Sequence, residues 1–188
     1  MNRLVFYYGS MNSGKSLNLL AFAAKLRNKN IPYIVLKSST DTRDGEFISS
    51  RPLKDKLPCM LWENGYWLPD NEIKDLKYIL VDEAQFLTAE QVNYLAALVD
   101  APDLDINVIC YGLRTDFKTK LFEGSKRLFE IADELYEIED VDAEGNKVIF
   151  NARVTKDGEI VTGGPQVVIG AEDKYQSMSR KDFYRRIK

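Results

Sequence analysis

An eight-residue stretch near the start of the chain constrains the fold more than any other feature. It follows the apolar run Leu4–Tyr8 and matches the pattern G-x-x-x-x-G-K-[ST] in full. From Lys15 to about Arg27, apolar residues recur at helical spacing. A loop between a strand and a helix can turn its backbone N–H groups and the positive helix end toward phosphate oxygens. A chance glycine-rich turn is the alternative, which the complete match in this context disfavours. The predicted phosphate-binding loop consists of Gly9, Ser10, Met11, Asn12, Ser13, Gly14, Lys15 and Ser16.

Two adjacent carboxylates follow the apolar run Tyr78–Val81 and supply a second part of such a site. Asp82 lies where a phosphate-loop fold needs a carboxylate on the Mg²⁺ side, and Glu83 can then face the attacking group. Lys15 is expected to reach the transferred phosphate, and Ser16 to place its hydroxyl on Mg²⁺. The alternative is a pair of solvated acids that open the next helix.

Strands and helices alternate along the first two thirds of the chain, which predicts a parallel sheet with helices on both faces. Thr88, followed three residues later by Gln91, matches a capping box and predicts a helix from about Ala89 to Leu98. Residues 37–70 are mostly polar and are expected to hold little regular structure. The expected strands are 4–8, 33–36, 78–81 and 106–111, and the other expected helices are 15–27 and 118–133. After Tyr136, turn clusters alternate with short strand-like stretches. The prediction is an α/β domain over 1–137 and a small hairpin-rich domain over 138–188.

Composition removes several function classes. The 188 residues include two cysteines and no histidine, so neither a Ser-His-Asp set nor a zinc site of four Cys and His ligands can form within the chain. The net charge of −3 disfavours a protein that holds nucleic acid by bulk electrostatics. No apolar stretch approaches the roughly 20 residues of a membrane span, and the start lacks a signal-peptide pattern. We therefore expect a cytoplasmic small-molecule kinase without a membrane or nucleic-acid partner.

Several segments, taken together, resemble one family, the thymidine kinases of the cellular, tetrameric type. The match covers nearly the whole chain, and phage-encoded members look most similar around 121–126. The matching segments are Asp41–Arg43, Asp82–Phe86, Tyr111–Phe117, Leu121–Lys126 and Gly170–Tyr175, with Arg180 and with Met11 inside the phosphate loop. The resemblance implies transfer of the γ-phosphoryl group of ATP to the 5′-hydroxyl of thymidine. It also implies a homotetramer or dimer, located in the host cytoplasm if the chain is phage-encoded.

The resemblance assigns roles to particular residues. Glu83 is implied as the base that accepts the hydroxyl proton, Lys15, Arg43 and Mg²⁺ as the positive charge, and Asp82 and Gln85 as part of the ATP site. The C-terminal domain resembles the family's lasso, in which the backbone of Val168 and Gly170 holds the pyrimidine. The implied nucleoside-binding residues are Met11, Phe86, Leu113, Phe117, Phe122, Asn151, Val168, Gly170 and Tyr175.

One departure from the family is large. Members usually tie the lasso with a zinc held by four Cys or His residues, and this chain places Asp142, Glu144, Ser179 and Asp182 at those positions. We favour the interpretation that the zinc is lost and these are solvated turn residues. The alternative is a Ca²⁺ or Mg²⁺ site built from oxygen ligands. Without zinc, the lasso is expected to depend on apolar packing at 148–150 and 167–169, on a neighbouring subunit or on substrate, and to be more mobile when empty.

Two other function classes remain open at this point. A non-catalytic nucleotide-binding regulator would keep the fold without the reaction, which the intact set Lys15, Ser16, Asp82, Glu83 and Arg43 disfavours. A nucleic-acid-directed ATPase would need a basic groove, which the acidic composition disfavours.

Overall fold

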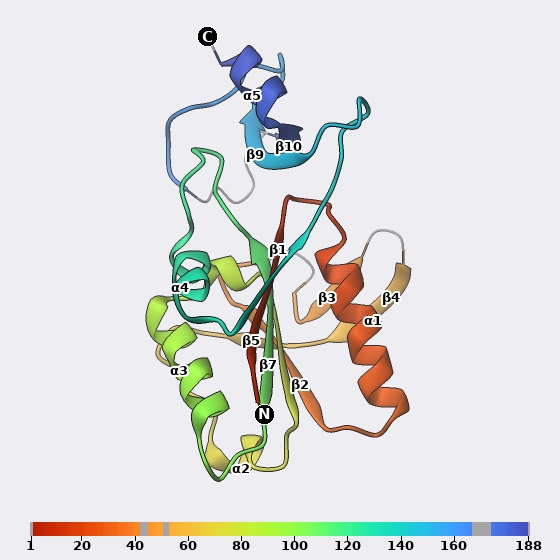
Figure 1. Ribbon diagram of the computed structural model, residues 1–188, viewed down its shortest axis with the longest axis vertical. Coiled ribbons are helices and arrows are strands. Elements are labelled where there is room, and N and C mark those ends of the chain that lie inside the picture. The colour runs from red at the N-terminus through yellow and green to blue at the C-terminus, as the bar shows by residue number, and fades with distance from the viewer. Residues whose placement is uncertain (1, 42–44, 51–52, 167–173, 188) are drawn as a thin grey trace.

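A computed structural model describes residues 2–41, 45–50, 53–166 and 174–187 (Figure 1). Its centre is a six-stranded, all-parallel sheet in the order β5-β2-β6-β7-β1-β8. This confirms the predicted α/β phosphate-loop class. The strands of the sheet are β1 (Leu4–Gly9), β2 (Tyr33–Ser38), β5 (Met60–Trp62), β6 (Tyr78–Asp82), β7 (Asn107–Leu113) and β8 (Glu134–Ile138).

Helices cover both faces of the sheet because its strands are apolar on both sides. On β1, Leu4 and Phe6 join one buried cluster and Val5 joins the other. Helix α1 (Lys15–Asn28) packs on the second face through Leu19 and Ala23. The first face carries α2 (Asp70–Ile73), the short 3₁₀ helix η1 (Ala84–Phe86), α3 (Ala89–Asp100) and α4 (Glu123–Ile131). Figure 1 shows α1 on one side of the sheet and α3 and α4 on the other.

The predicted capping box is confirmed. The Thr88 hydroxyl accepts the Gln91 N–H at 3.1 Å, and the Gln91 side chain accepts the Thr88 N–H at 3.1 Å. These two bonds satisfy donors that the first helical turn otherwise leaves open. Helix α3 therefore begins at Ala89, as predicted.

The expectation of little regular structure over 37–70 is wrong. Strands β3 (Phe47–Ser50) and β4 (Leu53–Pro58) form an antiparallel hairpin beside α1, and β5 adds an edge strand to β2. The hairpin is anchored by Ile48, and β5 by Trp62, both buried. Pro58 closes β4 and Pro69 precedes α2, so these prolines mark the ends of elements and not an irregular region.

The predicted helix over 118–133 is too long at its start. Residues 115–121 turn back on themselves through a bridge between Thr115 and Leu121, and Thr119 has a positive φ of 63°. Helix α4 begins only at Glu123, and strand β8, the strand-like stretch expected before the turn cluster at 140–146, follows it after two residues.

The C-terminal part forms a small module beyond the end of the sheet at which β1 and β7 finish (Figure 1). It contains the antiparallel pair β9 (Val148–Val154) and β10 (Lys174–Ser179), followed by α5 (Arg180–Arg186). Phe150, Val154, Met178 and Phe183 form its buried core, against which Ile149 also packs. Residues 167–169, expected to share in this packing, lie outside the described residues. The domain division after residue 137 stays a prediction.

No helix among the described residues is long and apolar enough to cross a membrane.

Candidate active site

The predicted phosphate-site residues meet at one edge of the sheet. Gly9 ends β1 in register with Leu113 at the end of β7, and Asp82 ends β6 beside Lys37 of β2. The carboxyl ends of parallel strands form the usual binding edge of open α/β sheets. The topology thus gathers, at this edge, side chains separated by up to a hundred residues.

The phosphate loop connects β1 to α1, and the Lys15 side chain folds back and bonds to the loop. Gly14 has φ +92°, a left-handed conformation that a side chain would strain, and it lies directly before the helix. The Lys15 ammonium group is largely buried and donates to the Ser10 carbonyl at 2.5 Å. The cation is therefore held over the loop, as a phosphate-binding lysine requires.

Asp82 and Ser16 form an oxygen-donor pair beside the loop. The Ser16 hydroxyl donates to Asp82 Oδ2 at 3.3 Å. Burial, followed by repulsion from Glu83, raises the pKa of Asp82 to about 7. A divalent cation fits here because it would stabilise the ionised carboxylate, and because carboxylate and hydroxyl oxygens are hard ligands.

Glu83 occupies a strained turn and is held by a neighbouring amide. Its φ of 50° and ψ of 38° lie in the left-handed region, which non-glycine residues seldom adopt. Nε2 of Gln85 donates to its carboxylate, and Oε1 of Gln85 accepts the Leu113 N–H at 2.9 Å. Gln85 is buried, so it links Glu83 rigidly to the end of β7. The predicted role of Gln85 at ATP stays a prediction.

Three of the predicted nucleoside-site aromatics lie on η1, on the loop after β7 and at the start of α4. Phe86 and Phe122 meet edge to face with ring centroids 5.6 Å apart. Phe117 is buried, with the Arg153 guanidinium 5.4 Å from its ring centroid. The Ser125 hydroxyl donates to the Leu113 carbonyl at 2.5 Å and ties α4 to the end of β7.

The remaining predicted site residues fall on the C-terminal module or outside the described residues. Asn151 is buried on β9, and its side-chain oxygen accepts the Met11 N–H at 2.7 Å. Tyr175 is half-buried on β10, opposite Arg153. Arg43, Val168 and Gly170 lie outside the described residues.

Sequence reasoning missed several residues that support this edge. Ser177 bonds the phosphate loop, Arg153 covers Phe117, and the buried pair Lys37–Asp41 lies at the end of β2 with 3.8 Å between Nζ and Oδ2. The alternation Phe-Asn-Ala-Arg-Val over 150–154 was an available signal, because it indicates a strand with one polar face.

The four positions for which the resemblance implies zinc ligands, Asp142, Glu144, Ser179 and Asp182, take part in local hydrogen bonds here. The Asp142 carboxylate accepts the N–H groups of Glu144 and Asn146 at 3.0 and 2.8 Å. Ser179 caps α5 through the Asp182 N–H, and Asp182 pairs with Arg185. Among the described residues, no group of three or more His, Cys, Asp or Glu side chains could hold a metal. This donor set does not fit a structural zinc, which takes Cys and His ligands.

The hydrogen bonds to the Asp142 carboxylate lead to a testable prediction about pH. The Asn146 N–H, helped by the Asn146 side chain and the Ser179 hydroxyl, lowers the pKa of Asp142. A depressed carboxyl pKa stabilises the fold above the unfolded-state value and loses that effect as pH falls through the folded value. Amide exchange of the full chain should therefore show several-fold lower protection at Glu144 and Asn146 at acid pH. Asp142→Asn should remove this pH dependence, and Asp157→Asn, in an exposed turn after the other end of β9, should leave it intact.

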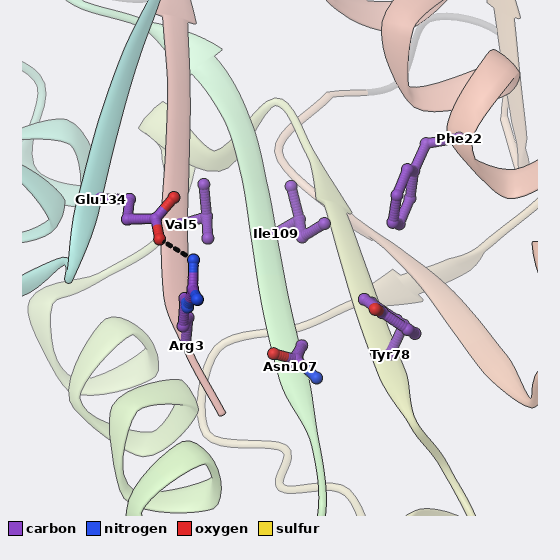
Figure 2. A pocket seen from close by; sticks show the side chains of 7 residues that line it. All are labelled: Arg3, Val5, Phe22, Tyr78, Asn107, Ile109 and Glu134. Carbon is purple, nitrogen blue, oxygen red and sulfur yellow. Dashed lines mark hydrogen bonds and ion pairs between the residues drawn. The ribbon is translucent and has the colours of Figure 1, made fainter. Parts of the chain in front are cut away.

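One cavity lies away from all of these residues. It measures about 370 Å³ and is lined by residues at the amino ends of the strands, among them Arg3, Tyr78, Asn107 and Glu134, with Phe22 from α1 (Figure 2). Arg3 and Glu134 form an ion pair across it. Because the phosphate loop leaves the opposite ends of the strands, this cavity is not part of the candidate active site.

Comparison with known proteins agrees with this geometry. A family model described as thymidine kinase matches residues 2–183. The thymidine kinase of Zymomonas mobilis is 38% identical and covers 100% of this chain and 98% of its own length. That of Enterobacteria phage T4 is 41% identical and covers 97% and 96%, and that of Xanthomonas oryzae is 39% identical and covers 97% and 90%. A solved Pif1 helicase from Candida albicans aligns with 75% of this chain and 37% of its own, at a TM-score of 0.47 and 16% identity, which is too slight a likeness to bear on function. The full-length matches confirm the resemblance seen in the sequence, and the chain belongs to the thymidine kinase family.

Proposed function

We propose that this chain transfers the γ-phosphoryl group of ATP to the 5′-hydroxyl of thymidine, giving dTMP and ADP. The observation that carries the proposal is the junction of the phosphate loop with Asp82 and Glu83. Ser16 and Asp82 are hydrogen-bonded at the helix start, and Glu83 is the next residue, held by Gln85. Family membership over residues 2–183 supports the same reaction.

Each site residue has a separate role in the proposed reaction. Backbone N–H groups of the phosphate loop and the Lys15 ammonium group hold the phosphates of ATP. Ser16 and Asp82 hold Mg²⁺, which supplies charge neutralisation when bound. Glu83 accepts the proton of the 5′-hydroxyl, and Gln85 fixes the orientation of its carboxylate. Arg43 adds positive charge near the transferred group.

The nucleoside is proposed to lie between η1, the loop after β7 and the C-terminal module. Phe86, Leu113, Phe117 and Phe122 are the proposed wall of this site. On the lasso side, Val168 and Gly170 offer backbone hydrogen bonds to the pyrimidine, and Tyr175 closes over it. Aromatic walls suit a nucleobase because they offer a large apolar area with defined stacking geometry.

Several accompanying features belong to the same proposal. The chain is proposed to act in the cytoplasm as a homotetramer or dimer, with Mg²⁺ and without zinc, nucleic acid or membrane as a partner. Residues 1–137 form its kinase domain and 138–188 its lasso domain.

A phosphotransfer assay with Mg-ATP across thymidine, deoxyuridine and the purine deoxynucleosides tests the reaction. We expect dTMP as the main product. Purified protein that binds Mg-ATP but phosphorylates no pyrimidine deoxynucleoside would refute the proposal and favour a nucleotide-binding regulator. Hydrolysis of ATP that depends on added DNA would favour a nucleic-acid-directed ATPase.

A further inference from the structure

Met11, in the middle of the phosphate loop, is bound on both of its backbone polar atoms by the C-terminal module. Its N–H donates to Oδ1 of Asn151 at 2.7 Å. Its carbonyl accepts the Ser177 hydroxyl at 2.8 Å. The two partners lie 140 and 166 residues further along the chain. Both hydrogen bonds therefore depend on tertiary structure alone.

The hairpin presents these two side chains as a pair. Asn151 of β9 and Ser177 of β10 are directly opposite each other in the antiparallel register. Because side chains alternate between the faces of a strand, the flanking Phe150 and Met178 point the other way. They pack against Phe183 of α5 in the core of the module. The apolar face of the hairpin thus fixes the position of its polar face.

Asn151 also reaches a second loop beside the site. Its Nδ2 donates to the Thr115 carbonyl at 3.5 Å. In the same loop, Asp116 accepts the Gln166 side-chain amide at 2.9 Å. An asparagine can accept with its oxygen and donate with its nitrogen at the same time, so it can bridge an N–H and a carbonyl of two backbones, which an ionised carboxylate, an acceptor only, could not. Asn151 is buried, which excludes water as a competitor for these bonds.

The Met11 N–H donates to Asn151 of the C-terminal module, so it does not serve as a donor to a phosphate oxygen. Residue 10, immediately before it, offers the carbonyl that holds Lys15. A shift of the loop at Met11 would therefore also move the acceptor of the Lys15 ammonium group. A loop fixed in this way has less freedom to lose when it binds phosphates, and binding is correspondingly stronger.

We propose that Asn151 and Ser177 are positioning residues that hold the phosphate loop at Met11 and thereby raise its affinity for Mg-ATP. The proposal rests on the proposed function only for the turnover measurements, since nucleotide affinity can be measured without thymidine. It gives the C-terminal module a role at the nucleotide in addition to its proposed role over the nucleoside.

The test compares Ser177→Ala, Asn151→Ala and the double variant with the full-length wild type. Mg-ATP affinity is measured by titration calorimetry, together with kcat and the KM values for ATP and thymidine. Loss of one hydrogen bond should weaken Mg-ATP binding about threefold to tenfold in each single variant. The double variant should lose less than the product of the two, because both side chains act on one residue.

Two further variants separate positioning from a general effect on folding. Ser177→Thr keeps the hydroxyl and should restore affinity to within about twofold of wild type. Gln176→Ala lies next to Ser177 but bonds Arg186 inside the module, so it should leave Mg-ATP affinity unchanged. Thermal unfolding of every variant checks that the titrated protein is folded. If Asn151→Ala does not fold, the Ser177 variants alone decide the outcome.

The outcomes are distinct. Folded variants that bind Mg-ATP as tightly as wild type would overturn the proposal, as would a change confined to the KM for thymidine. A wild-type chain that does not phosphorylate thymidine, with variants that still lose Mg-ATP affinity, would refute the proposed function and leave the positioning role standing.

Discussion

Replacing Glu83 by glutamine should remove most of the turnover while leaving both substrates bound. Glutamine keeps the size of the side chain, and its amide oxygen can still accept the hydrogen bond from Gln85. It cannot accept the proton of a 5′-hydroxyl. General bases contribute about 10²- to 10⁴-fold, and the loose transition state of phosphoryl transfer places this case toward the lower end. We expect kcat to fall about 100-fold. Steady-state kinetics and calorimetric titration with thymidine measure the two effects separately.

Glu90→Gln provides the matched control. Glu90 is an exposed residue in the first turn of α3, and its replacement should change neither kcat nor binding. If Glu83→Gln retains wild-type kcat, Glu83 is not the base. If it loses thymidine binding together with kcat, its role is in binding and not in proton transfer.

Replacing Asp82 by asparagine should nearly abolish activity and at the same time make the ligand-free protein more stable. Asp82 is buried, and burial and Glu83 raise its pKa to about 7. A raised carboxyl pKa means that the charged form opposes folding, and the effect grows as pH rises from the unfolded-state value through 7. Asparagine removes this charge and can still accept the Ser16 hydroxyl through its amide oxygen. Each kcal/mol gained should raise Tm by about 2–4 °C in a chain of this size.

The loss of activity has a separate cause, because asparagine is a poorer Mg²⁺ ligand than a carboxylate. We expect kcat/KM for Mg-ATP to fall about 100-fold or more, as for other electrostatic groups of active sites. Thermal melts at pH 5 and pH 8 check the stability, and the gain from Asp82→Asn should be larger at pH 8. Asp105→Asn, at an exposed carboxylate that pairs with Lys77 at the far end of the sheet, should change neither property. An Asp82→Asn protein with a lower Tm than wild type at pH 8 would contradict the charge argument.

The parts of the fold that could be predicted are those that depend on sequence patterns within a few neighbouring residues. The phosphate loop lies within eight residues, and the capping box at Thr88 and Gln91 spans four. The buried strands of a parallel sheet are nearly continuous apolar runs, as Tyr78–Val81 shows, so they stand out from the rest of the sequence. These local signals were sufficient for the fold class and for bringing Lys15, Ser16 and Asp82 to one edge of the sheet, and their role at phosphate stays a prediction.

The parts that could not be predicted depend on contacts between distant segments. Strand β5 has only three residues and exists because Met60–Trp62 can pair with β2. Strand β8 follows α4 without a turn signal, and its place in the sheet is fixed by its pairing with β1. Ser177 looks like an ordinary strand residue, and only the folded chain places its hydroxyl on Met11. Sequence alone could indicate a polar face on this hairpin but not what that face touches.

The left-handed backbone at Glu83 has a consequence for any search for more thermostable variants of this protein. An L-residue in that conformation costs roughly 1–2 kcal/mol that glycine would not incur. Selection for heat resistance alone would therefore favour glycine at position 83 and would discard the proposed base. Directed evolution of this chain needs a selection for turnover at every round, because at this position heat tolerance and catalysis place opposite demands on the backbone.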